Sequence, residues 1–140
     1  MDPVAFGVPA DVAFDYLVDP RNRPEWQSSL RRVEDVRGEP RVGQRWVDVT
    51  APGLRPAMET TRLDRPAVWT EQGTWRGITA TLTLCFTTTA GGCLVTADVR
   101  VTGRGVARAL GPLLTRAAGL AVPADLRSAA TRLSARADGQ

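Results

Sequence analysis

The 140-residue sequence predicts an α+β domain in which a long C-terminal helix covers one face of an antiparallel sheet. Two patterns support this prediction. Apolar residues from 105 to 136 recur at the i, i+3, i+4 and i+7 spacing of one helical face. Before them, alternating apolar and polar residues lie between Gly- and Pro-containing turns, which is typical of strands. Because the apolar stripe of a helix needs a partner, we expect the helix to pack on the sheet.

The beginning of the chain predicts one strand and two short helices. Residues 4–8 form an apolar run that indicates the first strand. Pro9 and Asp11 then mark a helix start, because proline fits the first turn and an acidic side chain is stabilised near the positive end of the helix dipole. This helix ends at Asp19 and Pro20, and a second short helix is expected from residue 24 to about residue 30.

Four strands are expected next, at residues 32–36, 46–50, 58–63 and 68–75. The last two form a hairpin around residues 64–67, with Leu63 opposite Val68. The side of this hairpin with the larger aromatic content is expected to face the interior: Met58, Thr60, Arg62, Trp69, Glu71 and Trp75. The face of Trp46 stays open, because Val47 and Val49 compete with it for the interior.

A second hairpin is centred on Gly91 and Gly92, a favoured two-residue turn that pairs Ala90 with Cys93. Cys85 and Cys93 then lie on opposite faces, so we expect no disulfide between them, in keeping with a reducing compartment. The inner face of this hairpin is expected to hold Leu82, Leu84, Phe86, Thr88, Val95, Ala97, Val99 and Val101.

The C-terminal helix is expected to be long, with prolines at two positions. Pro112 and Pro123 each start a helical segment or kink a continuous helix, because proline lacks a backbone donor. The arginines on its other side are interpreted as a solvated face, the alternative being contact with a partner or an anionic membrane. Its apolar stripe consists of Val106, Ala109, Leu110, Leu113, Leu114, Ala117, Leu120, Ala121, Leu126, Ala130 and Leu133.

Composition argues against several classes of function. The net charge is only +3 and the arginines are scattered, so we expect no nucleic-acid binding. No apolar run approaches the roughly 18 residues of a membrane span, and no secretory leader opens the chain, so we expect a soluble, cytoplasmic protein. Without histidine, and with two cysteines too few for a zinc site, we expect no metal. No glycine-rich phosphate loop is present, so no cofactor is expected.

Two local signatures, together with the order of the elements, resemble a known family. The first signature is residues 9–17 (PADVAFDYL) followed by residues 19–26 (DPRNRPEW). The second is Val42-Gly43 before one strand, together with residues 91–96 (GGCLVT) at another. This combination resembles the START-like (SRPBCC) superfamily, which includes polyketide cyclase/dehydrase and lipid-transport proteins. The family usually has Gly-Thr at the last of these turns, where this chain has Cys93. The resemblance covers essentially the whole chain and implies one helix-grip domain over residues 1–140, with a cavity between a curved sheet and the long helix.

The resemblance directs attention to large apolar side chains and to small residues of the helix, which leave space beside its leucines. The alternative for the tryptophans, Met58 and Tyr16 is that they pack the core, with the Tyr16 hydroxyl at the rim. The residues expected to bind a ligand are Tyr16, Trp26, Trp46, Met58, Trp69, Trp75, Leu82, Phe86, Leu113, Leu114 and Ala117.

Arg62 and Glu71 are the candidate catalytic residues, because the predicted register places them diagonally on the same inner face. A buried arginine–carboxylate pair is costly to desolvate, and in a cyclase it could hold an oxyanion while a proton moves. The alternative is a solvated cross-strand salt bridge worth about 0–1 kcal/mol. Asp48, Glu59 and Asp98 could also pair as acid and base, although nothing in the sequence fixes them on a shared face.

These observations lead to a functional hypothesis with an alternative. We expect the protein to bind a hydrophobic or polyketide-like small molecule between sheet and helix, and the resemblance adds cyclisation or dehydration of that molecule as an activity. The alternative is a non-catalytic lipid carrier or a protein-interaction module. Monomer and homodimer are both compatible with the sequence.

Overall fold

The computed structural model describes residues 2–139, without the side chains of Val106 and Ala107. The predicted place of Val106 on the apolar stripe of the helix therefore lies outside the described side chains. The elements occur in the order β1 (Val4–Phe6), α1 (Ala10–Val18), the 3-10 turn η1 (Pro20–Asn22), α2 (Arg23–Trp26), β2 (Leu30–Glu34), β3 (Arg45–Thr50), β4 (Ala57–Asp64), β5 (Val68–Trp75), β6 (Ile78–Thr89), β7 (Gly92–Gly103), η2 (Gly105–Leu110) and α3 (Gly111–Asp138).

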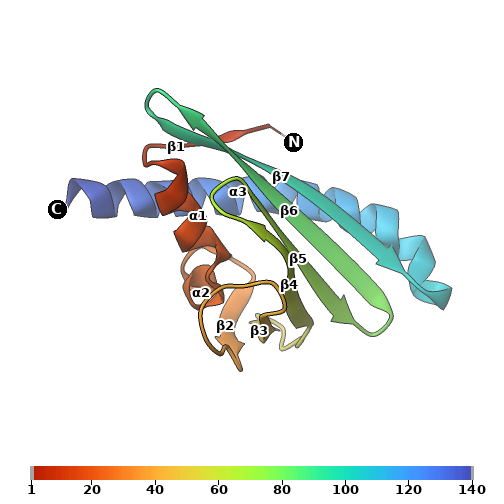
Figure 1. Cartoon of the computed structure of the whole chain (residues 1–140). Helices are drawn as coiled ribbons and strands as arrows, with labels where there is room; N and C mark the ends of the chain where they lie inside the picture. The colour runs from red at the N-terminus through yellow and green to blue at the C-terminus, as the bar shows by residue number, and fades with distance from the viewer. Residues whose placement is uncertain (1, 140) are drawn as a thin grey trace.

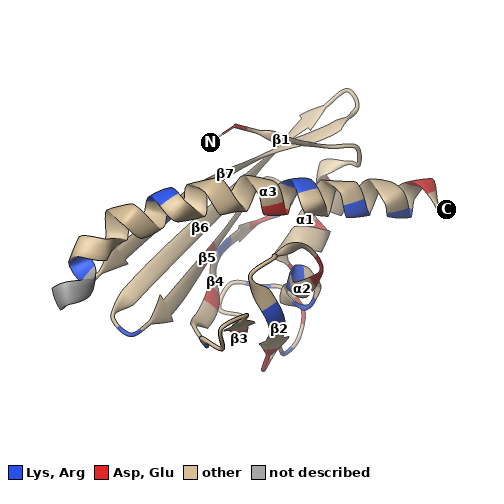
Figure 2. Ribbon diagram, turned by 180° about the vertical axis from the view of Figure 1, so that it is seen from behind, with Lys and Arg blue, Asp and Glu red and all other residues tan. Residues whose placement is uncertain are grey.

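The seven strands form one antiparallel sheet in the order β1-β7-β6-β5-β4-β3-β2. Helix α3 lies across one face of this curved sheet, behind it in Figure 1 and in front of it in Figure 2, while α1 and α2 lie near one end. The predicted α+β class is confirmed, and the arrangement is the helix-grip fold that the resemblance implied.

The hairpin of β4 and β5 differs from the predicted register near its turn. Leu63 pairs with Trp69 instead of Val68, and Thr60 pairs with Glu71 as predicted. A β-bulge between Thr60 and Arg62 accommodates the one-residue difference. Because a one-residue shift reverses the faces, Leu63 packs against the core and Arg62 is exposed.

The hairpin of β6 and β7 also turns earlier than predicted. Thr89 pairs with Gly92 and Thr88 with Cys93, so the turn residues are Ala90 and Gly91. The shift in pairing is an even number of residues, so each side chain keeps its predicted face. Cys93 is buried and Cys85 is exposed, and both are free.

Helix α3 begins at Gly111, after the 3-10 turn η2, with Pro112 in its first turn. Pro123 lies inside the helix, which continues to Asp138 and is 28 residues long. The helix also contacts β7 through Thr115, whose hydroxyl oxygen accepts a hydrogen bond from the backbone nitrogen of Val101 at 2.8 Å. Strand β1 pairs with β7 only at residues 93–95, so Thr115 satisfies part of the β7 edge that β1 leaves open.

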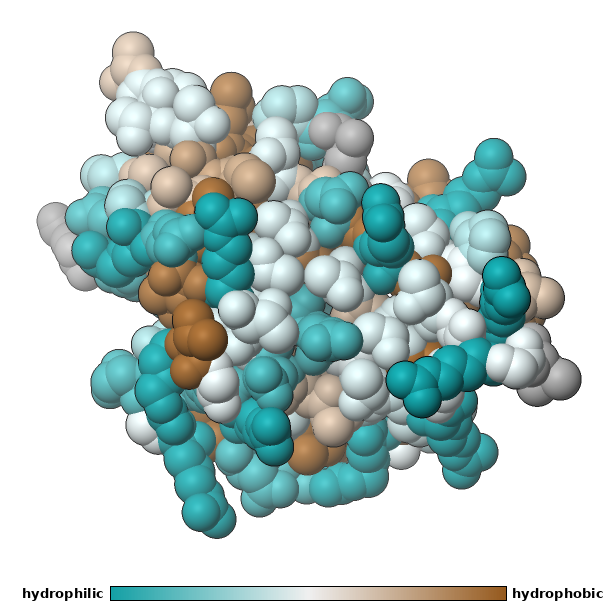
Figure 3. Space-filling view, turned by 45° about the vertical axis from the view of Figure 1, so that its right-hand side comes forward, coloured by the Kyte–Doolittle hydropathy of each residue, from teal (hydrophilic) through white to brown (hydrophobic). Residues whose placement is uncertain are grey.

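The core lies between the sheet, α1 and the C-terminal half of α3. Its largest fully buried apolar side chains are Trp46, Trp69, Phe14, Leu17, Leu84 and Leu126. The N-terminal half of α3 instead leaves Leu113 and Leu120 of the predicted stripe exposed, and Leu110, at the end of η2, is exposed as well. The face in Figure 3 is mainly hydrophilic, and apolar side chains reach it in separate patches. The less complete packing beside the N-terminal half of α3 is where the candidate site lies.

Candidate functional site

A cavity of about 620 Å³ lies between the sheet and the N-terminal half of α3. The rest of its wall comes from strands β3 to β7, from α2 and from the segment that follows α2. Small residues of α3 leave much of this space open, because Ala117, Ala118 and Ala121 stand where larger side chains would reach the sheet. Most of the wall is apolar, and its larger apolar side chains are Trp26, Met58, Trp75, Ile78, Leu82, Leu84, Val99, Leu114, Val122 and Leu126.

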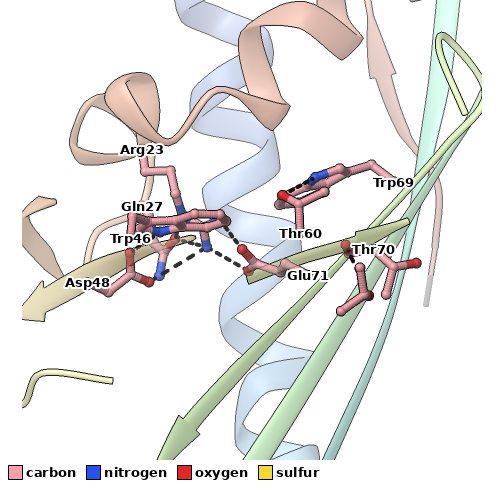
Figure 4. A network of polar contacts seen from close by, with 9 residues as sticks. Arg23, Gln27, Trp46, Asp48, Thr60, Trp69, Thr70 and Glu71 are labelled. Atoms are coloured by element: carbon pink, nitrogen blue, oxygen red, sulfur yellow. Dashed lines mark hydrogen bonds and ion pairs between the residues drawn. The ribbon is translucent and has the colours of Figure 1, made fainter. Parts of the chain in front are cut away.

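One part of the cavity wall carries buried charges, shown in Figure 4. Arg23, at the start of α2, uses both terminal nitrogens to donate to the two carboxylate oxygens of Glu71, with Nη2 2.8 Å from Oε1. Its Nε and Nη2 also donate to Oε1 of Gln27, at 3.0 and 2.8 Å. Asp48 lies beside them, with Oδ2 4.0 Å from Nη2 of Arg23. Arg23 is 3% exposed, and Asp48 and Glu71 are each 4% exposed.

Aromatic rings surround the guanidinium group of Arg23. Its central carbon lies 5.6 Å from the ring centre of Trp26 and 5.9 Å from those of Trp46 and Trp69. Arginine is suited to such a site because its planar, weakly hydrated cation interacts favourably with aromatic rings. Trp46 also donates from Nε1 to Oδ1 of Asp48 at 2.9 Å, which holds that carboxylate next to the pair.

Burial and neighbouring charges act in opposite directions on Glu71. Burial raises the pKa of the Glu71 carboxyl above its ordinary value, Arg23 opposes this effect, and the nearby Asp48 carboxylate adds to it. For Arg23, burial alone would lower the pKa, but the two carboxylates raise it, so the guanidinium stays charged. The site thus combines a permanent cation with a carboxyl group that binds a proton more readily than an exposed glutamate does.

Seven of the sequence-predicted site residues line the cavity together. They come from α2, β4, β5, β6 and α3, and only the fold brings them to one space: Trp26, Met58, Glu71, Trp75, Leu82, Leu114 and Ala117. Glu71 is the candidate catalytic residue that faces this space.

The other predicted ligand-binding residues lie outside the cavity wall. Trp46 and Trp69 are fully buried behind it, and Trp69 donates to the hydroxyl of Thr60 at 3.2 Å. Phe86 packs edge-to-face on Phe14 in the core, with ring centres 5.1 Å apart. The interior face of the sheet extends beyond the cavity, so a side chain can point inward without lining it. These three side chains therefore belong to the core that supports the site.

Tyr16 and Leu113 are also placed away from the cavity. The Tyr16 hydroxyl donates to Oε1 of Glu25 at 3.0 Å, so it joins α1 to α2. Leu113 is 65% exposed. Adjacent helical positions point about 100° apart, so the α3 face that directs Leu114 into the cavity turns Leu113 outward.

Arg62 does not lie beside Glu71, as the predicted catalytic pair required. The bulge in β4 turns this side chain to the exposed surface, where its Nε donates to Oδ2 of Asp64 at 2.7 Å. The partner of Glu71 is Arg23, 48 residues away in sequence. The sequence patterns did not single out Arg23, although it lies within the quoted DPRNRPEW signature. A useful signal would have been the inward-facing carboxylate at Glu71, since a buried carboxylate requires a partner.

The sequence matches a family described as polyketide cyclase / dehydrase and lipid transport, over residues 3–138. The chain belongs to this family. The START-like resemblance drawn from the DPRNRPEW and GGCLVT signatures is thereby confirmed. No curated protein sequence matches this family member closely enough to count as a relative.

Several solved structures share the fold of this polyketide cyclase/dehydrase family member. The di-domain ARO/CYC StfQ from the steffimycin biosynthetic pathway is similar with a TM-score of 0.75 and 20% identity, over 98% of this chain and 51% of StfQ. Ara h 8.0201 has a TM-score of 0.74 and 13% identity, over 96% and 95% of the two chains. Protein MLL2253 from Mesorhizobium loti has a TM-score of 0.73 and 14% identity, over 95% and 94%. At these identities the likeness concerns the fold alone.

Two further properties concern only residues 2–139. None of the helices in this range combines the length and the apolar character needed to cross a membrane. Within the same range, the side chains of Cys, Asp and Glu form no group of three placed to hold a metal ion.

Proposed function

We propose that this protein binds a hydrophobic, polyketide-like small molecule in the cavity between the sheet and α3. The observation that supports this proposal is a cavity of about 620 Å³ whose apolar wall also carries Arg23, Asp48 and Glu71. Small-molecule sites in proteins are typically apolar cavities with a few well-placed polar groups. Membership of the polyketide cyclase/dehydrase and lipid transport family agrees with such a ligand.

The buried charges favour a ligand site over simple core packing. A buried ion pair often stabilises a fold no better than apolar side chains of similar volume, because desolvation offsets the attraction. The rest of the cavity wall is mostly apolar, so the desolvation of Arg23, Asp48 and Glu71 is an exceptional free-energy cost there. Recognition of a polar group on an otherwise apolar ligand would explain why these charged residues are present.

A second candidate function is cyclisation or dehydration of the bound molecule, and the buried Glu71 carboxyl favours it. In a dehydration, Asp48 could take the proton from the carbon next to a carbonyl group, and the protonated Glu71 carboxyl could give its proton to the hydroxyl on the following carbon, which leaves as water as the C–C double bond forms. The alternative of a non-catalytic carrier uses the same cavity. Glu71→Gln separates the two, since a catalyst would lose turnover while keeping its ligand and a carrier would show no turnover to lose.

Native mass spectrometry of the freshly purified protein, compared with its denatured mass, tests the binding function directly. Extra mass that leaves on denaturation would give the size of a bound ligand. As a probe of the cavity, anthracenemethanol is added and its fluorescence followed. Saturable binding is expected, and Ala117→Trp is expected to abolish it by filling the space opposite the sheet.

Ala124→Trp is the matched control, because Ala124 is exposed on the same helix and is not part of the cavity wall. It is expected to bind the probe like the unaltered protein, and thermal unfolding of both variants checks that they fold. No bound mass together with no probe binding would overturn the proposal. Probe binding by folded Ala117→Trp equal to that of Ala124→Trp would overturn it as well.

A further inference from the structure

The cavity wall contains more acidic than basic side chains. Among the residues that the structure describes, three carboxylates line it, from Asp48, Glu71 and Asp125, against the single guanidinium of Arg23. Asp125 lies on α3, half-buried, and its Oδ1 accepts a hydrogen bond from the backbone nitrogen of Ser28 at 3.2 Å. The wall therefore carries more carboxylates than cations. Trp26 adds a buried donor to the same wall, since its Nε1 has no partner among the described residues.

Arg23 has little capacity left to bind an anionic ligand. Its Nε donates to Gln27, its Nη2 donates to Gln27 and Glu71, and its Nη1 donates to Glu71. The positive charge is thus already matched by Glu71, with Asp48 nearby. A ligand carboxylate would have to displace one of these contacts inside a poorly solvated space.

Asp48 is the acceptor that these contacts leave open. Its Oδ1 accepts from Nε1 of Trp46, but Oδ2 accepts no hydrogen bond from the described residues, and its distance of 4.0 Å from Nη2 of Arg23 is too long for one. The side chain is 4% exposed and belongs to the cavity wall. This oxygen is accessible from the cavity, so a hydrogen-bond donor on a ligand can bind it.

We propose that the cavity selects apolar ligands that carry a hydrogen-bond donor, a protonated amine above a neutral hydroxyl, and disfavours those that carry a carboxylate. This inference rests on the proposed function, because it concerns the ligand of the same cavity. Asp48 accepts the donor through Oδ2, and the apolar wall formed by β6 and α3 covers the remainder of the ligand. Fatty acids and other anionic lipids are therefore poor ligands, since they place like charges close together at low dielectric.

Three fluorescent probes of matched size test this order: anthracenemethylamine, anthracenemethanol and anthracenecarboxylate, each titrated near neutral pH. We expect the amine to bind about tenfold or more tightly than the alcohol, since hydrogen bonds to charged groups contribute more than neutral ones. The carboxylate is expected to bind more weakly than the alcohol.

Asp48→Asn identifies the group responsible, because the amide keeps an oxygen acceptor for Trp46 and removes the charge. This variant is expected to reduce the amine-to-carboxylate affinity ratio about tenfold. Asp98→Asn is the control, because it makes the same change of charge at an exposed position of β7, and it is expected to keep the ratio of the unaltered protein.

The outcomes separate this inference from the proposed function. If none of the three probes binds, the proposed function is overturned together with the inference. If all bind and the carboxylate is equal to or tighter than the amine, the inference is overturned while the proposed function stands. An unchanged ratio in folded Asp48→Asn would also overturn the inference.

Discussion

Arg23 and Glu71 lie 48 residues apart in the sequence and meet inside the protein through two hydrogen bonds. Arg23 begins the four-residue helix α2, and Glu71 lies on β5, the central strand of the sheet. The pair therefore fastens the short helical connector to the middle of the sheet. It also forms part of the cavity wall, so the same contact contributes to both the fold and the candidate site.

Removing one partner of this pair is expected to be strongly destabilising. Arg23→Met leaves the buried carboxylates of Glu71 and Asp48 without their cation, which is expected to lower the free energy of unfolding by about 3–5 kcal/mol. Arg62→Met is the matched control, since Arg62 is exposed and, among residues 2–139, its side chain pairs only with Asp64, and its effect is expected within about 0.5 kcal/mol. Urea denaturation followed by tryptophan fluorescence measures both values.

A double variant distinguishes an unpaired charge from lost packing. If the cost of Arg23→Met arises from the unpaired Glu71 carboxylate, adding Glu71→Leu should recover part of the lost stability. A double variant less stable than Arg23→Met would contradict this explanation. An effect of Arg62→Met as large as that of Arg23→Met would contradict the assignment of the buried pair.

This pair also shows where reasoning from the sequence ended. The inward face of Glu71 followed from the alternation along β5, and the structure places it there. Its partner did not follow, because contact between residues 23 and 71 depends on how α2 docks, and no local periodicity encodes docking. The bulge in β4 was missed for a related reason: an extra residue in a strand leaves no mark in a sequence of ordinary strand composition.

Tyr16 is expected to titrate at unusually high pH. Burial, the hydrogen bond to Glu25 and the Glu25 charge together raise the pKa of its phenol from 10.0 to about 12, against the opposing effects of Arg136 and Arg132. Since the pKa is higher in the folded state, the stabilisation is complete below pH 10 and is lost as pH rises from about 10 toward 12. Tyr16→Phe is expected to lack this loss.

Ultraviolet absorbance of the tyrosinate measures the pKa without ambiguity, because the chain has a single tyrosine. The midpoint is expected near 12 in the folded protein and near 10 in concentrated urea. A midpoint near 10 without denaturant, under conditions where circular dichroism shows the fold intact, would be incompatible with the buried contact to Glu25.

For α3, the local sequence pattern predicted the helix but not which part of it packs against the sheet. The i, i+3, i+4 spacing predicted a long helix against the sheet, and the structure confirms it. The pattern could not separate the part of the stripe that packs from the part that does not. Leu126 and Leu133 enter the core, whereas Leu113 and Leu120 are exposed. Space opposite the first half of the helix depends on the curvature of the sheet, which no single segment specifies.

Gly92 is expected to be essential for the docking of β1 on β7. The sequence pattern had indicated only a role in the turn. A Cβ atom added there would lie 2.1 Å from the backbone oxygen of Phe6 and 3.0 Å from the backbone nitrogen of Val8, and the φ of Gly92 is +151°. Backbone atoms cannot move aside as a flexible side chain can. Gly92→Ala is therefore expected to lower the free energy of unfolding by about 2 kcal/mol or more, by forcing β1 away from β7.

Gly91→Ala is the control for this prediction, because a Cβ atom at Gly91 would meet no atom of the described residues within 4 Å. Its effect is expected within about 0.5 kcal/mol. Urea denaturation gives both free energies, and amide hydrogen exchange at residues 4–6 reports whether β1 has separated. Equal effects of the two substitutions would mean that the turn, and not the close approach of β1, requires glycine. Faster exchange in β1 of Gly92→Ala alone would instead assign the requirement to that contact.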